Sequence, residues 1–108
     1  MPVLCQNWAL MKIRSGESVV LVLRDPRERL LGILGEIDMA GVHLRAIDLS
    51  YFDDWVRSII AGEQYLPMND YFIPMWRVER LMRDEGTQDA QSMAEQFQQK
   101  TGRKLGEF

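Results

Sequence analysis

The stretch Arg29–Ala46 (RLLGILGEIDMAGVHLRA) decides the fold of this chain. Its first half, Arg29–Ile37, is apolar enough for a strand, and glycines inside a strand are typical of a bend or a close backbone approach, which we expect at Gly32 and Gly35. Asp38–Gly41 is typical of a tight turn, and beyond it apolar and polar residues alternate as in a half-buried strand. The stretch therefore predicts a bent β-hairpin.

Three further short strands are predicted on either side of this hairpin. Ser18–Leu23 (SVVLVL) is β-branched and ends at the turn signal Asp25-Pro26. Tyr71–Ile73 is ended by Pro74, and Val78–Met82 follows after a very short connection. Because no crossover helix separates the first three strands, we expect a mainly β fold, a small, strongly bent, five-stranded barrel with added helices.

Two helices are predicted in addition to the strands. The first lies near residues 51–61, within an insertion at 50–62, because apolar residues recur there at helical spacing. We expect Ser50 as its N-cap, Asp53 as the partner of Ser50 in a capping box, and Gly62 as its C-terminal stop. The second helix is expected near 88–100, followed by a polar tail to residue 108. The segment before Ser15 fits a helix or a strand.

Composition excludes several classes of protein. The chain has 108 residues with 13 basic and 16 acidic side chains, a net charge of −3, which indicates a single domain over 1–108, with the barrel at about 17–84. A lone Cys5 excludes a disulfide scaffold and a zinc knuckle, and it fits the reducing cytoplasm. No apolar run is long enough to span a membrane, so no membrane partner is expected. The acidic balance argues against a broad grip on nucleic acid.

The segment Ser18–Asp84 resembles the Sm-like fold, the bent barrel of the RNA-associated Sm, LSm and Hfq proteins. Gly32–Asp38 (GILGEID), followed by Leu44, is similar to the first sequence box of that family, and Ile73–Leu81 (IPMWRVERL) is similar to the second. Proteins of this family assemble into rings by pairing their fourth strand with the fifth strand of a neighbour. The resemblance therefore implies a homo-oligomer whose interface residues are Tyr71, Phe72, Ile73, Val78, Arg80 and Leu81.

The chain departs from the family at the positions that contact RNA. The base-contacting Asn is missing, since the first turn is one residue shorter and leads into Gly41-Val42, and Pro74-Met75 stands where the second turn carries its usual polar pair. The resemblance implies at most a weak RNA contact by Asp38, Gly41 and Arg77. We expect a non-enzymatic scaffold or adaptor ring whose partners are itself and either RNA or another protein.

A second family of β-barrels provides the alternative interpretation. PilZ domains bind cyclic di-GMP through spaced arginines and a later Asp-x-Ser-x-x-Gly motif, to which Arg24, Arg27, Arg29 and Asp38–Gly41 bear some similarity. The spacing differs, because residue 28 is Glu and Ala40 has no hydroxyl group. The alternative function is thus a barrel that senses a small ligand.

Catalytic and metal-binding patterns are not found in the sequence, so neither enzyme activity nor a cofactor nor a metal is predicted. His43 alternates with Val42 and Leu44, which predicts that it faces solvent. Asp53 and Asp54 are explained by the first turn of a helix. One region is rich in aromatic residues and Met, which fits core packing of the extra helix or a partner interface: Tyr51, Phe52, Trp55, Tyr65, Met68, Tyr71 and Phe72.

Overall fold

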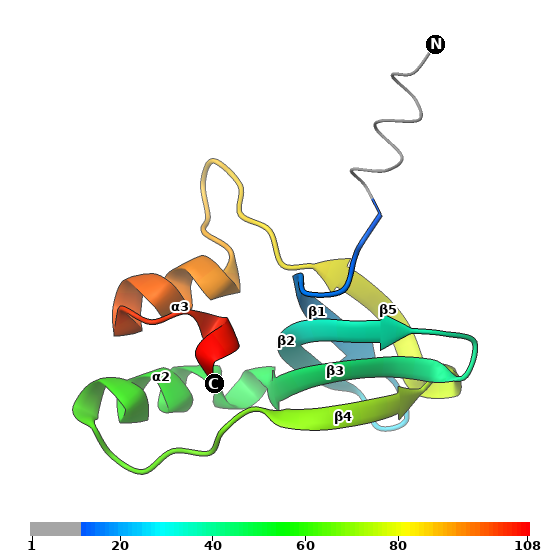
Figure 1. The fold of residues 1–108 in the computed structure, drawn as a ribbon, viewed down its shortest axis with the longest axis horizontal. Coiled ribbons are helices and arrows are strands. Elements are labelled where there is room, and N and C mark those ends of the chain that lie inside the picture. Colours follow the sequence, from blue (N-terminus) through cyan, green and yellow to red (C-terminus); the bar gives the residue numbers. More distant parts are fainter. Residues whose placement is uncertain (1–11) are drawn as a thin grey trace.

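A computed structural model describes residues 12–108 of the chain. Five antiparallel strands form one sheet in the order β4-β3-β2-β1-β5 (Figure 1). The strands are β1 (Ser18–Leu23), β2 (Glu28–Ile37), β3 (Gly41–Asp48), β4 (Asn69–Pro74) and β5 (Val78–Arg83). The predicted fold class, mainly β with added helices, is confirmed, and each predicted strand lies within an observed one.

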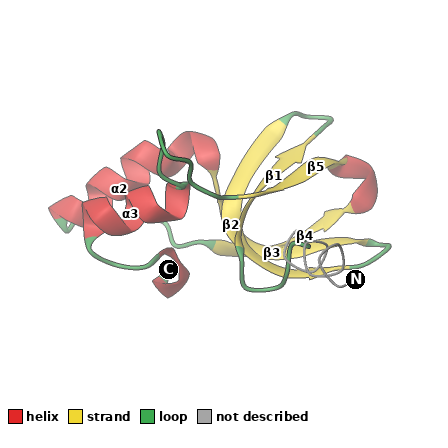
Figure 2. Ribbon diagram, turned by 90° about the horizontal axis from the view of Figure 1, so that it is seen from above, coloured by secondary structure: helices red, strands yellow, loops and turns green. Residues whose placement is uncertain are grey.

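The sheet is strongly curved but it does not close into a barrel. Figure 2 shows β2 and β3 curling so that β1 and β5 face β3 and β4 across the inside of the curve. β4 and β5 are the two edges, joined by the short 3-10 helix η2 (Met75–Arg77), and they do not pair with each other. The closed barrel that the sequence predicts is therefore not observed, because no hydrogen bonds join β4 to β5.

Two glycines of β2 allow the curvature. A Cβ at Gly32 would lie 2.1 Å from the carbonyl oxygen of Arg45, so only glycine lets β2 and β3 approach this closely. A Cβ at Gly35 would lie 2.9 Å from the His43 carbonyl oxygen, and the pairing register shifts here, between Leu34 and Glu36. Both glycines therefore have the predicted role of a bend or close approach.

Each face of the sheet has its own hydrophobic core. The inner core fills the curve of the sheet with residues from all five strands, mostly aliphatic: Val19, Leu21, Leu23, Leu30, Leu34, Val42, Leu44, Ala46 and Ile73, with Tyr71, Val78 and Leu81 packed against them. The outer core lies between the opposite face and the helices, and it is rich in aromatic residues: Leu31, Ile47, Phe52, Trp55, Val56, Met68, Phe97, Leu105 and Phe108.

The predicted inserted helix is observed as α2 (Phe52–Ala61), which ends at Gly62 in the left-handed conformation, as predicted. The prediction for its beginning was wrong. Ser50 lies in a preceding 3-10 helix, η1 (Leu49–Tyr51), and donates to the carboxylate of Asp48 through its N–H (2.8 Å) and its hydroxyl group (2.6 Å). Asp48 therefore caps the entry to this turn, and Tyr51 at the α2 N-cap makes no side-chain cap.

The second helix, α3 (Met93–Thr101), begins with a capping box formed by Ser92 and Glu95. Asp84, at the end of β5, accepts hydrogen bonds from the N–H groups of Met93 (2.7 Å) and Ala94 (2.9 Å), which ties the helix to the sheet. The expected polar tail folds back instead, because Gly102 reverses the chain and Leu105 and Phe108 enter the outer core.

Candidate functional site: the two sheet edges

β4 presents an unpaired backbone edge. Its inner side pairs with β3, and the N–H of Met75 donates to the Ala40 carbonyl oxygen at 2.9 Å, just beyond the last paired residues. Backbone direction alternates along an antiparallel strand, so Asp70 and Phe72 point their amide groups away from β3. Pro74 fits this alternation, since it has no N–H to offer.

β5 presents the second edge. Its inner side pairs with β1, and the N–H of Asp84 donates to the Ser18 carbonyl oxygen at 2.9 Å. By the same alternation, Leu81 points its amide group away from β1. No further strand of residues 12–108 covers either edge. An uncovered strand edge is a template for pairing with another chain.

The six predicted interface residues divide into two groups. The side chains of Tyr71, Ile73, Val78 and Leu81 pack in or against the inner core. Those of Phe72 and Arg80 are exposed to solvent on the edge strands. All six lie on the two edge strands, and four of them offer mainly their backbone and the rim of a side chain.

The three residues predicted to contact RNA are engaged within the chain. The Asp38 carboxylate accepts from the N–H groups of Ala40 (2.8 Å) and Gly41 (3.1 Å) and so caps the β2–β3 turn. At Gly41 a Cβ would lie 2.2 Å from the Ile73 carbonyl oxygen. Arg77 donates to the carbonyl oxygen of Pro26 (2.8 Å) and to Glu28 (3.1 Å), so it holds η2 against the β1–β2 turn.

Two of the three arginines that invited the comparison with PilZ domains line one hollow. Arg27 and Arg29 border a space of about 320 Å³ together with Asp48 and Ser50, and Arg27 also lies 4.0 Å from Glu79 of β5. Arg24 is directed elsewhere, because its Nε donates to the Trp76 carbonyl oxygen at 2.7 Å. The three side chains therefore do not all line one site.

A groove of about 420 Å³ lies on the outer face of the sheet, between the strands and the C-terminal segment at Gly106. Arg45 and Asp70 border it and form a two-pronged ion pair of 2.9 and 3.2 Å, which lowers the pKa of the Asp70 carboxyl group. His43 is exposed, as predicted, and packs on the Phe72 ring at 4.8 Å. Within residues 12–108 no cluster of His, Cys, Asp and Glu is suited to a metal ion.

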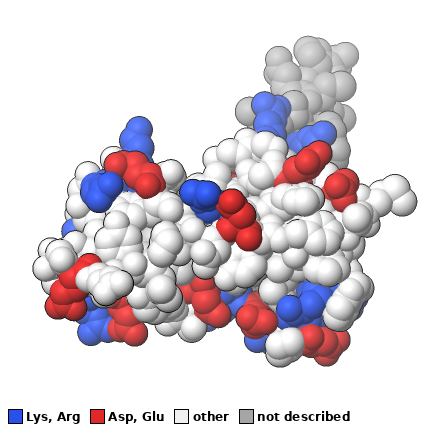
Figure 3. Space-filling view, turned by 60° about the horizontal axis from the view of Figure 1, so that its bottom comes forward, with Lys and Arg blue, Asp and Glu red and all other residues white. Residues whose placement is uncertain are grey.

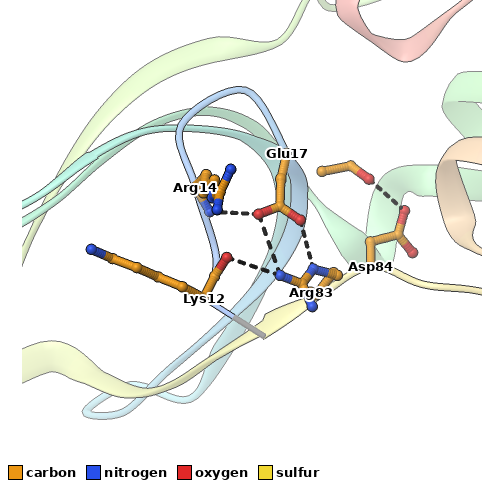
Figure 4. A network of polar contacts seen from close by, with 6 residues as sticks. Lys12, Arg14, Glu17, Arg83 and Asp84 are labelled. Atoms are coloured by element: carbon orange, nitrogen blue, oxygen red, sulfur yellow. Dashed lines mark hydrogen bonds and ion pairs between the residues drawn. The ribbon is translucent and has the colours of Figure 1, made fainter. Parts of the chain in front are cut away.

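A polar network fixes the beginning of β1 to the end of β5 (Figure 4). Arg83 donates to Glu17 at 2.6 Å and to the Lys12 carbonyl oxygen at 3.1 Å. The hydrogen bond from Arg83, and then the one from the Arg14 N–H, lower the pKa of Glu17. The β5 edge is therefore held in place from its inner side. Cys5 lies outside the described residues.

Comparisons with protein-family models, with curated proteins and with solved structures found no match for this chain. Over residues 12–108, no helix combines the length and apolar character needed to cross a membrane.

The sequence analysis assigns three exposed apolar residues to turns without predicting their exposure. They are Met39 in the hairpin turn and Met75 and Trp76 in η2. A Trp in a turn of only three residues between two strands was the available signal, because so short a turn has no interior in which to bury it.

Proposed function

We propose that this chain is a non-enzymatic assembly module whose copies join edge to edge, β4 of one copy against β5 of the next. The observation that carries the proposal is the pair of edges, at the two ends of one curved sheet, that no strand of residues 12–108 covers. Two different edges on one molecule make a head-to-tail contact, and such a contact closes into a ring when each step turns the next copy by a constant angle. The resemblance to the Sm-like family supports the same arrangement.

The register of this pairing follows from the direction of the amide groups. In an antiparallel pair, residues whose amide groups face each other stand directly opposite. Phe72 opposite Leu81 meets this condition. The same register places Tyr71 opposite Met82 and Asp70 opposite Arg83.

We propose that the main role of the assembly does not include binding RNA. Asp38 and Arg77 direct their hydrogen-bonding groups to backbone atoms of their own chain. The ring would then act as a scaffold or adaptor for other proteins. This proposal differs from a small-ligand sensor, for which the arginines near the β1–β2 turn would have to converge.

Native mass spectrometry of the purified protein tests the proposal, with Phe72→Lys as the edge variant. A lysine on an edge strand disfavours pairing, and Phe72 is exposed, so the subunit should remain folded. Ile60→Lys on α2 is the matched control, because it adds the same charge at an exposed apolar position away from the edges. We expect closed rings for the wild type and the control, and smaller species for Phe72→Lys. A wild type that is monomeric at high concentration would refute the proposal.

A further inference from the structure

Four exposed apolar side chains gather at the end of the sheet farthest from the helices. The side chain of Met39, in the β2–β3 turn, is 97% exposed, and that of Trp76, in η2, is 61% exposed. Ile37 and Met75 are also exposed, and the hydrogen bond from Met75 to Ala40 holds the two turns side by side. We call these four residues, Ile37, Met39, Met75 and Trp76, the tip patch. Figure 1 places both turns at this end, and Figure 3 shows uncharged atoms projecting from it.

The backbone beneath the tip patch is held in place by its own contacts. The Asp38 carboxylate caps the hairpin turn, and Arg24 and Arg77 hydrogen-bond across the junction of η2 with the β1–β2 turn. The patch is thus presented on fixed turns. An exposed apolar patch that is rimmed by polar residues is typical of an interaction site.

We infer that the tip patch of one copy packs against the tip patch of a second copy about a two-fold axis. The four side chains carry no charge, so a copy of the same surface can face them without repulsion. Two of the four are Met, whose unbranched side chains adapt to an irregular opposing surface.

The rim of the tip patch carries charges of both signs. On the hairpin side, Glu36 and Asp38 are exposed, and Lys12 and Arg14 line the same groove as Glu36 and Ile37. On the η2 side, exposed Arg24 is followed by exposed Asp25. A rim of mixed sign does not repel a second copy of itself.

The area of the tip patch is sufficient for a modest dimer. At ordinary side-chain sizes the four residues expose on the order of 500 Å², in the upper part of the range for the largest patch on a monomer. Two such patches and part of their polar rims bury about 1,200 Å² in total, the lower limit for a stable interface.

The position of the tip patch allows this two-fold contact to form between two of the proposed rings. The total number of copies in such an assembly rests on the proposed function. η2 joins β4 to β5, so edge pairing leaves the patch uncovered and repeats it on one face of the ring. Two rings would then stack through their tip patches. The two-fold contact itself does not depend on the ring, and the two interfaces can be removed one at a time.

The experiment compares the copy number of four proteins by native mass spectrometry: the wild type, Trp76→Lys, Phe72→Lys and the double variant. We expect a double ring, a single ring, a dimer and a monomer, in that order. Leu66→Lys is the matched control, because Leu66 is 64% exposed and lies outside both surfaces. It should keep the copy number of the wild type. Trp76→Lys should break the two-fold contact, because the new charge would stand opposite the same charge of the second copy or against an apolar surface.

Two results would overturn the inference. If Trp76→Lys keeps the wild-type copy number, the tip patch does not join copies of this chain, whatever Phe72→Lys does. If in addition the wild type sediments with phosphatidylcholine–phosphatidylglycerol vesicles and Trp76→Lys does not, a lipid surface covers the patch. A loss of copy number in Phe72→Lys alone would leave the proposed ring standing and refute only the two-fold contact.

Discussion

The two ends of the sheet carry similar side chains in opposite surroundings. At the helical end, Trp55 is fully buried and stacks on Phe97, with their ring centres 4.8 Å apart. At the other end, Trp76 stands in solvent on a turn that the Arg24 side chain holds by a hydrogen bond to the Trp76 carbonyl oxygen. Within residues 12–108, the helices therefore cover the aromatic residues of the outer core, while Trp76 stays exposed. The difference shows that a Trp side chain serves the core at one end of the sheet and the surface at the other.

The largest expected effect is the loss of stability when the buried Trp is removed. Trp55→Ala should lower the free energy of unfolding by about 3–5 kcal/mol, because it leaves a cavity between α2, α3 and the sheet. Trp76→Ala, measured where both proteins are monomeric, should change it by less than about 0.5 kcal/mol. Urea titration followed by circular dichroism measures both. Equal losses would mean that Trp76 also belongs to a core.

The next effect concerns the bend that separates the two ends. Gly32→Ala should destabilise the fold by about 1–3 kcal/mol, since the new Cβ would overlap the backbone of β3. Gly106→Ala is the matched control, because a Cβ there meets no atom within 4 Å. Thermal unfolding distinguishes the two variants. A neutral Gly32→Ala would contradict the close approach of β2 and β3.

A smaller loss of stability is expected at the junction of β5 and α3. Asp84→Ala should cost about 1–2 kcal/mol, because it removes the acceptor for the N–H groups of Met93 and Ala94 at the positive end of the helix. Asp89→Ala, on the exposed loop before the helix, is the control and should be nearly neutral. Faster amide exchange at Met93 and Ala94 would accompany the loss. Unchanged exchange there would contradict this anchoring role.

The smallest effect is the pH dependence of the network at β1 and β5. The pKa of Glu17 is lowered by its hydrogen bonds to Arg83 and Arg14, so its contribution to stability is complete above the unfolded pKa. The contribution is lost as the pH falls through the folded pKa. Melting temperatures of the wild type and Glu17→Gln should therefore differ slightly at pH 7 and converge in strong acid. A difference that grows toward acid would contradict this sign.

The sequence predicted the inner core better than the outer core. β1, β2 and β3 were found because alternation and glycine position are local signals, and residues such as Leu21 and Val42 follow them directly. The ends of the chain were harder. The sequence predicts a polar tail that includes Phe108. It does not reveal that Phe108 is buried, because the contacts of Phe108 with Trp55 and Phe97 join positions that the sequence pattern does not relate. The start of α2 was missed because Asp48 caps a 3-10 turn, which no helical period reveals.

The candidate site was predicted in part. The strand order places β4 and β5 at the two edges of the sheet. In the sequence, Pro74 at the end of a short strand indicates an edge position for β4. The shortness of the turn indicates that Trp76 is exposed. The neighbourhood of Trp76 and Met39 could not be inferred, because the hydrogen bond from Met75 to Ala40 joins residues far apart in sequence.

A disulfide trap between neighbouring copies tests edge-to-edge assembly most directly. Tyr71→Cys and Met82→Cys, introduced together in a Cys5→Ser background, stand directly opposite in the proposed register. In such a pair the Cα atoms lie about 4.5 Å apart, within reach of a disulfide bond. Mild oxidation should give a ladder of covalent multimers that ends at the ring size, while each single-cysteine variant gives dimers at most. Monomers alone from the double-cysteine protein would contradict the proposed assembly.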